Sequence, residues 1–363
     1  MAALVSLGVL GWRQRRSAIV ALQHDSTARR PLLRLALGEA ALFGIAVGVA
    51  VGLGRTPPPP TRSEPSPAEV ALGFDLSESP TIAAVFTDWR FDLIFGTAAV
   101  VMASIYLAAV YRLARRGDPW SKRRTICWLI GCITMLFATS SGLGMYMAAM
   151  YSMHAIVQLL LTIAVPALLV QGAPVTLALK ALKAAEPNSA PGPREWVQSV
   201  VAAPMTRLLT QPWTALAILM VGVYGLCIAG VYDVAMSDHA AHMATIGFFP
   251  VQWHAVLRCR QRRGGPTPGP MSTQRRVAMT LFALSQFVVA GIVVVRMQAV
   301  LGGDFYRSLR LSWQTNLLSD QRVGGVIVSV SSAVAMLTVI AIVAAKRTGC
   351  LRTDNLRAPT IDA

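Results

Sequence analysis

The chain has 363 residues, of which 54% are hydrophobic and only 14% are charged. Soluble domains carry about 25% charged residues, so this composition excludes an ordinary soluble protein and indicates a membrane protein. The net charge of +16 does not indicate nucleic-acid binding, because the basic residues form short clusters between apolar runs, which is how membrane topology is encoded.

Apolar runs follow one another along the whole chain. The first, at about residues 1–11, is too short to cross a bilayer, since a membrane-spanning helix needs about 20 apolar residues. Each later run predicts a full span, at residues 32–53, 91–111, 125–146, 148–171, 213–232, 239–257, 277–300 and 323–345. The predicted fold class is therefore all-α: a polytopic transmembrane helix bundle of about eight full spans plus an N-terminal partial span.

Two of the connecting segments are long. Residues 55–84 are rich in proline and serine, which predicts an extended linker on the outer side of the membrane. From Gly192 onward, apolar residues recur at helix spacing, as at Val197, Val200 and Met205. This second pattern predicts a helix that lies in the plane of the membrane interface.

Arginine and lysine gather in alternate connections, and this asymmetry orients the spans. The basic clusters lie within residues 13–30, 112–124, 258–276 and 346–357. By contrast, residues 233–238 carry two aspartates and no basic residue. The positive-inside rule places the basic clusters and the C-terminal tail, residues 351–363, in the cytoplasm.

Histidine and methionine concentrate at the outer ends of two spans. In MYMAAMYSMHAIVQLLL, residues 145–161, four methionines precede a histidine that is expected about two turns below the outer surface, at ~1.5 Å of rise per residue. Two more histidines, three residues apart, open the sixth span and share a helix face. Thioether sulfur and imidazole suit Cu(I), so the candidate metal ligands are His154, His239, His242, Met150 and Met153.

The same residues allow other interpretations. Methionine is a common filler of apolar cores, and an intramembrane histidine can simply hydrogen-bond a neighbouring helix. Haem between helices needs paired histidines at matched depth, and only His154 is predicted inside the hydrocarbon. Asp304 and Asp320 are expected to be solvated loop charges. The motifs GxSxG, HExxH, Walker A and GxGxxG are absent from the sequence, so no enzyme activity is expected.

Several stretches resemble the CtaG family of membrane proteins that assist assembly of caa3-type cytochrome c oxidases. They are RRGDPWSKRRTICWLIGCITMLFATSSGLGMY, YSMHAIVQLLLTIAVPALLVQGAPVTLALKAL, YGLCIAGVYDVAMSDHAAHM and GGDFYRSLRLSWQTNLLSDQRVGG. The resemblance covers about residues 85–350 and implies a seven-helix membrane domain there. It also implies help in building the copper-containing oxidase, with copper handled at the outer face.

Residues 1–54 are similar to the last helices of CopD, a copper-import family that some bacteria fuse ahead of CtaG. This second resemblance implies a fusion of the two families in which most of the CopD part is missing. Residues 55–84 would then be the linker between the two parts.

The chain departs from the CtaG pattern where further metal ligands would be implied. Gln158 stands four residues after His154, where the family carries a second histidine, and Phe248 stands where another histidine is expected. No histidine lies near Phe287, and SSAVAM, residues 331–336, lacks the acidic residue often found in the last span. These departures predict a divergent relative with a low-coordination Cu(I) site or with none.

The residues and the resemblance together predict an integral membrane assembly factor for cytochrome c oxidase that handles Cu(I) at the extracytoplasmic face of the plasma membrane. Its expected partners are the lipid bilayer, terminal oxidase subunits and CopD-like or periplasmic copper proteins. The alternatives are a metal-free membrane scaffold related to CtaG, a copper permease and a haem-binding membrane protein.

Overall fold

The computed structural model describes residues 65–185, 191–209, 211–227, 231–238, 241 and 272–355, together with positions 8, 11–12 and parts of 33–52. The chain divides into two compact units, Met1–Pro65 and Ser66–Ala363. All described residues up to position 52 are helical, which agrees with the helices predicted for the first unit.

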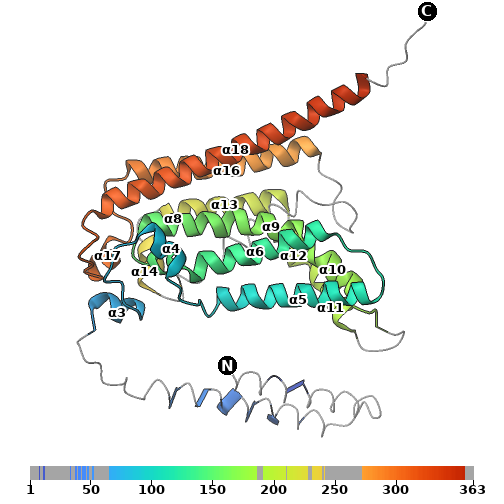
Figure 1. The fold of residues 1–363 in the computed structure, drawn as a ribbon, viewed down its shortest axis with the longest axis horizontal. Helices are drawn as coiled ribbons and strands as arrows, with labels where there is room; N and C mark the ends of the chain where they lie inside the picture. Colours follow the sequence, from blue (N-terminus) through green and yellow to red (C-terminus); the bar gives the residue numbers. More distant parts are fainter. Residues whose placement is uncertain are drawn as a thin grey trace, which may run out of the picture. The chain divides into compact units, whose positions relative to one another are not determined.

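The second unit is built from helices, drawn in Figure 1. In chain order they are α3 (Pro67–Leu72), α4 (Ile82–Thr87), α5 (Phe95–Arg115), α6 (Lys122–Ser140), α7 (Gly142–Tyr146), α8 (Tyr151–Leu159), a π-helical turn (Leu160–Ala164), α9 (Val165–Gln171), α10 (Pro174–Ala181), α11 (Pro193–Ala202), α12 (Pro204–Leu209), α13 (Pro212–Cys227), α14 (Val231–Ser237), α16 (Thr273–Arg296), α17 (Gly303–Ser308) and α18 (Leu317–Asn355). An isolated bridge joins Trp89 to Ser141, and no strand occurs among the described residues. The all-α prediction is confirmed.

Four helical segments are long and apolar enough to cross a membrane. They are Phe95–Arg115, Tyr151–Ala181, Val277–Arg296 and Leu317–Ala345, and a shorter apolar helix covers Pro212–Gly225. The four correspond to the spans predicted at 91–111, 148–171, 277–300 and 323–345. The span predicted at 239–257 lies outside the described residues, so the count of eight stays a prediction.

The span predicted at 125–146 is divided by the structure into α6 and α7. The backbone is extended at Ser141, whose hydroxyl accepts a hydrogen bond from the Leu143 amide and so caps α7. The Ser140 carbonyl accepts a hydrogen bond from the Arg90 amide at 2.8 Å. The chain breaks here because the serines at the end of the apolar run bond local backbone groups in place of continuing the helix.

The span predicted at 148–171 contains a π-helical turn between α8 and α9. Pro166 stands near the start of α9. Proline cannot donate a backbone hydrogen bond, and its ring collides with the carbonyl four residues earlier, here that of Thr162. Widening the helix by one residue places the Val165 amide on the Leu160 carbonyl and accommodates the proline without ending the span.

The prediction that residues 55–84 form an extended linker is wrong for the second half of this segment, which contains α3 and the start of α4. Ser66 caps α3, Pro67 occupies its first turn, and Gly73 ends it with a left-handed backbone (φ 75°), so the proline and serine here start a helix. After α3, the Leu76 carbonyl accepts a hydrogen bond from the Trp313 indole at 2.8 Å, which fixes this segment to the second unit.

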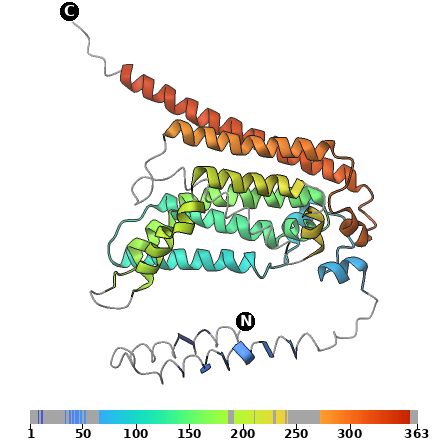
Figure 2. The same ribbon diagram turned by 180° about the vertical axis from the view of Figure 1, so that it is seen from behind.

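The long helices of the second unit lie side by side, with successive ones running in opposite directions, and define two ends that are seen in both views (Figures 1 and 2). The α17 end carries α3, α4, α14 and α17, and the α10 end carries α10, α11 and α12. Helix α18 packs on both α16 and α8, while α13 packs on α16 and α5 packs on α6. The start of α8 therefore lies beside the start of α18, at the α17 end.

Helices α16 and α18 touch backbone to backbone. A Cβ atom built on Gly291 would lie 2.6 Å from the Gly325 carbonyl oxygen and 2.3 Å from the Ser329 hydroxyl. The Ser329 hydroxyl in turn donates to the Val288 carbonyl at 3.2 Å. Small residues at a crossing allow this close approach, which is typical of helix pairs in membranes.

Charges are divided unequally between the two ends. The described acidic residues at the α17 end are Glu69, Asp75, Glu78, Asp88, Asp92, Asp233, Asp238, Asp304 and Asp320, and the basic ones are Arg90, Arg296, Arg307, Arg310 and Arg322. The described basic residues at the α10 end are Arg112, Arg115, Arg116, Lys122, Arg123, Arg124, Lys180, Lys183, Arg194, Arg207 and Arg275, and the acidic ones are Asp118 and Glu195. The positive-inside rule predicts from this asymmetry that the α10 end is cytoplasmic, and this orientation stays a prediction.

The helix predicted after Gly192 is present as α11 and α12. The Glu195 carboxylate accepts hydrogen bonds from the backbone amides of Ala185 and Gly192, which hold its pKa below the usual range. Trp196, Val200 and Met205 are exposed. An exposed apolar face suits the predicted position in the membrane interface, which stays a prediction.

Candidate functional site

His154 lies in the second turn of α8, near the α17 end. Its side chain is 7% exposed, and its ring meets the Tyr232 ring edge-on, with centroids 5.6 Å apart. Tyr232 belongs to α14, so two helices far apart in sequence hold the imidazole. His154 is therefore buried in the bundle, and its predicted place on the outer side of the membrane stays a prediction.

The start of α8 is held by an acidic residue that the sequence assigned to solvent. The Ser152 amide donates to Asp320 Oδ2 at 3.3 Å, and the Ser152 hydroxyl donates to the other oxygen of the same carboxylate. Asp320 lies in the first turn of α18. The expectation of a solvated loop charge is wrong for Asp320, but Asp304 is fully exposed and pairs with Arg307 at 2.8 Å.

A cavity of about 70 Å³ opens beside His154. Its described lining residues are Tyr151, His154, Ala155, Gln158, Leu159, Tyr232, Phe287 and Val328. Because a water molecule occupies about 30 Å³ in the liquid, the inner cavity, as we name it, has room for a small ion or one or two waters. It is mainly apolar, with an imidazole, an amide and two phenols on its walls.

Gln158 and Thr162 are polar residues that follow His154 at intervals of four residues along the same span. Gln158 follows His154 by four residues and therefore shares its helix face. The Gln158 Nε2 and Thr162 Oγ1 atoms are buried and have no hydrogen-bond partner in the part of the chain that the structure describes. Buried donors of this kind usually bind a water molecule or another ligand.

The two candidate methionines lie outside the described lining of the inner cavity. Met153 packs against two apolar clusters, one around Tyr146 and Leu301 and one around Leu143 and Leu161. Met150 is the N-cap residue of α8. Neither methionine is among the described residues that line the inner cavity.

The second half of the predicted copper site remains untested. His239 and His242 lie outside the described residues, as does Phe248. Within the described residues, no group of three or more His, Cys, Asp and Glu side chains could hold a metal ion. Phe287, near which the family would carry a histidine, lines the inner cavity.

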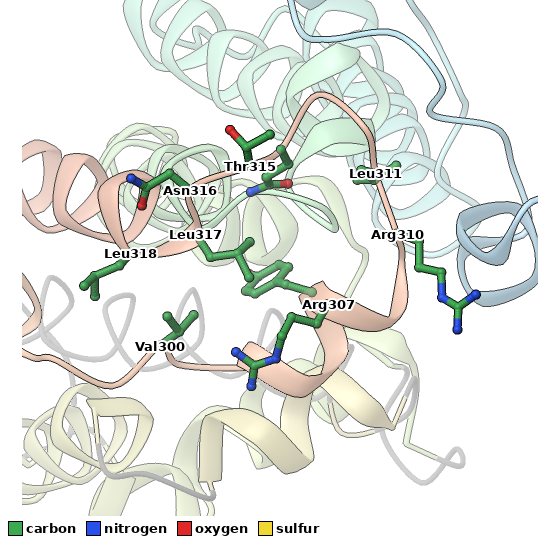
Figure 3. Close-up of a pocket in the computed structure, with 10 residues that line it drawn as sticks. Val300, Arg307, Arg310, Leu311, Thr315, Asn316, Leu317 and Leu318 are labelled. Carbon is green, nitrogen blue, oxygen red and sulfur yellow. The ribbon is translucent and has the colours of Figure 1, made fainter.

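A second, larger pocket lies at the α17 end (Figure 3). The outer pocket, as we name it, has a volume of about 400 Å³. Its lining residues are Val300, Tyr306, Arg307, Arg310, Leu311, Gln314, Thr315, Asn316, Leu317 and Leu318. It lies between α17 and the first turn of α18.

A pair of tyrosines stands between the two spaces. Tyr232 lines the inner cavity and Tyr306 lines the outer pocket. Their hydroxyl oxygens are 2.9 Å apart and share a hydrogen bond that either could donate. Burial raises the pKa of Tyr306 well above its usual range, so this phenol stays protonated and neutral near pH 7.

The loop that carries the outer pocket is fixed by Gln321. Gln321 is fully buried. Its Oε1 accepts from the Leu301 amide at 2.8 Å, and its Nε2 donates to the Ala299 carbonyl at 3.1 Å. The sequence places Gln321 between the charged residues Asp320 and Arg322, so its burial could not be predicted from the local composition.

The family model described as "Cytochrome c oxidase caa3 assembly factor (Caa3_CtaG)" matches residues 104–348. The chain is 33% identical over 281 residues to "Uncharacterized protein ML1998" of Mycobacterium leprae, covering 75% of this chain and 41% of the relative. It is 34% identical over 296 residues to "Uncharacterized protein Mb0105" of Mycobacterium bovis, covering 79% of this chain and 43% of the relative.

The chain therefore spans about two fifths of the length of these curated relatives. No solved structure matches it significantly.

Proposed function

The chain belongs to the family of cytochrome c oxidase caa3 assembly factors, and from this membership we propose that it handles Cu(I) for the oxidase at the α17 end of its bundle. The observation that carries the proposal is the buried imidazole of His154 on the wall of the inner cavity. In this proposal the copper ion is the cargo, and the protein passes it to an oxidase subunit by ligand exchange without acting as an enzyme.

The chemistry of the cavity wall supports a weak, transferable site. An imidazole nitrogen is a good ligand for Cu(I), and the Tyr232 ring beside it limits its rotation. Gln158 offers only a poorly ligating amide in place of a second imidazole. His154 would therefore hold the ion with one further donor, His239 or His242, and a low coordination number favours release to a partner.

The charge distribution supports an orientation in the plasma membrane. The basic α10 end and the C terminus would be cytoplasmic, and the acidic α17 end would be extracytoplasmic. Acidic side chains around the α17 end attract cations. The same end would meet the oxidase subunits and the CopD-like or periplasmic proteins that deliver copper.

A metal-free scaffold is the second candidate, and a specific observation favours it. The described wall of the inner cavity contains one imidazole, no methionine, and Phe287 near a family histidine position. In this case the family resemblance would reflect docking on the oxidase, and the inner cavity would hold water.

We expect His154→Ala to weaken Cu(I) binding about tenfold, because it removes the strongest donor described on the cavity wall. The measurement is anaerobic Cu(I) titration of the full chain in detergent against a chromogenic chelator. His254→Ala, in a predicted cytoplasmic position, is the matched control and should bind as the wild type does. Gln158→His should tighten binding, since it places a second imidazole on the same helix face.

If wild type binds no Cu(I), or if His154→Ala and His254→Ala bind it equally well, the copper proposal is wrong. Oxidase activity of cells that carry His154→Ala then separates the candidates. A scaffold that needs no metal would leave oxidase copper content and activity unchanged in this variant.

A thiol-labelling experiment tests the proposed orientation. We expect a membrane-impermeant maleimide added to intact cells to label Asp304→Cys at the α17 end and to spare Lys122→Cys at the α10 end, in a background whose native cysteines are replaced by serine. Both side chains are exposed. Labelling of Lys122→Cys alone would reverse the orientation and place the inner cavity on the cytoplasmic side.

A further inference from the structure

The outer pocket combines cationic and apolar walls at one end of the membrane-spanning helices. Figure 3 shows Val300 and Leu317 facing one another across the pocket, with Arg307 beside them and Arg310 at the rim. The pocket begins a few residues beyond Arg296, where α16 ends, and reaches Leu317, where α18 begins. Both helices are candidate spans, so the pocket lies at the level of the lipid head groups.

Two guanidinium groups line this pocket although the surrounding end of the bundle is mainly acidic. Arg307 pairs with Asp304 at 2.8 Å, but the two side chains are 62% and 102% exposed. An ion pair in this position is weak and engages one face of a group that has five N–H donors. Arg307 therefore presents donors to the pocket that match the geometry of a phosphate. Arg310 adds a second positive charge at the rim, with its side chain extending away from Val300 and Leu317 (Figure 3).

Two neutral polar residues, Gln314 and Thr315, also line the pocket. The Gln314 Nε2 atom is buried and has no hydrogen-bond partner within the described ranges. Buried N–H groups are normally paired, so this amide would bond an acceptor in the pocket once its side chain turns toward it.

The backbone at the rim adopts a costly conformation. Arg310 has a φ of 48°, in the left-handed region that residues with a Cβ atom rarely adopt. Its amide donates to the Arg307 carbonyl at 3.3 Å, which closes a tight turn between the two arginines. Backbone strain of this kind is concentrated at ligand-binding sites.

The apolar wall distinguishes a lipid from a free anion. Val300, Leu311, Leu317 and Leu318 line the pocket beside the arginines. A free phosphate would gain nothing from these side chains, whereas the glycerol and first acyl carbons of a lipid would bury apolar surface against them.

From this arrangement we propose that the outer pocket binds the phosphate group of an anionic phospholipid, with Arg307 as the donor within the pocket and Arg310 as a second positive charge at its rim. The proposal is independent of copper binding. It makes the α17 end a lipid-binding site whose wall includes Tyr306, the partner of Tyr232.

The test measures lipid retained by the full chain, purified in detergent, by native mass spectrometry and by thermal stabilisation. The probes are dioleoyl phosphatidylglycerol, dioleoylglycerol, which lacks the phosphate, and inorganic phosphate. We expect binding of phosphatidylglycerol only, weakened about tenfold by Arg307→Gln through loss of charge-assisted hydrogen bonds. Arg322→Gln, at the same end but outside the pocket, is the control and should bind as wild type does.

Arg310→Gly separates binding from folding. Glycine adopts the left-handed region readily, so this variant should melt at the wild-type temperature or above it and yet retain less phosphatidylglycerol. Equal retention by wild type, Arg307→Gln and Arg310→Gly would overturn the proposal. If inorganic phosphate binds as well as phosphatidylglycerol does, the pocket binds free phosphate and the lipid proposal is wrong. If dioleoylglycerol binds as well as phosphatidylglycerol does, the pocket does not recognise the phosphate group.

Discussion

Gln321→Leu is expected to destabilise the folded protein by about 1–3 kcal/mol, because it leaves the buried Leu301 amide without a partner. The Gln321 side chain also bonds the Ala299 carbonyl, but Ala299 is exposed, so water can replace that second bond. Leucine has a similar volume, so the loss comes from hydrogen bonding and not from a cavity. Thermal unfolding of the full chain in detergent, followed by circular dichroism, measures the effect.

Gln298→Leu provides the matched control for this change. Gln298 is exposed, and its contacts to Arg296 and Arg322 are long, at 3.5 and 3.4 Å. The control should change the stability by less than about 0.5 kcal/mol. Equal melting temperatures for the two variants would mean that the loop before α17 does not depend on Gln321.

Gly291→Val is expected to destabilise the α16–α18 pair by about 1–3 kcal/mol, the usual cost of overpacking a close contact. The new Cβ would meet the Gly325 carbonyl and the Ser329 backbone amide, at 2.6 and 2.9 Å. Neither backbone group can move aside as a flexible side chain could, so the helices must separate. Detergent thermal unfolding and the yield of folded protein after size-exclusion chromatography report the loss.

The same substitution at a glycine with open space isolates the packing effect. No described atom would lie within 4 Å of a Cβ atom built on Gly225 in α13. Gly225→Val should therefore leave the melting temperature near that of the wild type. If both valine variants melt alike, then the helix crossing tolerates a larger separation than the structure indicates.

Hydropathy alone located the four helices that are long and apolar enough to cross a membrane, because an apolar run of about 20 residues has few alternatives to a helix in a bilayer. It failed at the ends of the runs. Ser140 and Ser141 end α6 through local backbone hydrogen bonds, and Ser66, Pro67 and Gly73 start and end α3 in a segment whose composition indicated a linker. Capping depends on single residues, which a composition window averages away.

The candidate site was predicted in part. The burial of His154 follows from its place in an apolar run, and its distance from the α17 end follows from the helix rise. The roles of Tyr232 and Asp320 could not be predicted, since Asp320 meets Ser152 across 168 residues of sequence. Met150 and Met153 stay predicted ligands; helical spacing puts Met153 on a different face from His154, and in the structure Met153 packs against apolar neighbours.

The Tyr232–Tyr306 hydrogen bond has no fixed polarity, because either hydroxyl can be the donor. A cation beside Tyr232 would draw the lone pairs of that oxygen toward itself, so that Tyr232 donates to Tyr306 and the Tyr306 proton turns away from the pair. An anion on the far side would favour the same arrangement by accepting that proton. A cation in the inner cavity and an anion in the outer pocket would thus favour the same direction of the Tyr232–Tyr306 hydrogen bond. This coupling would need no displacement of the helices.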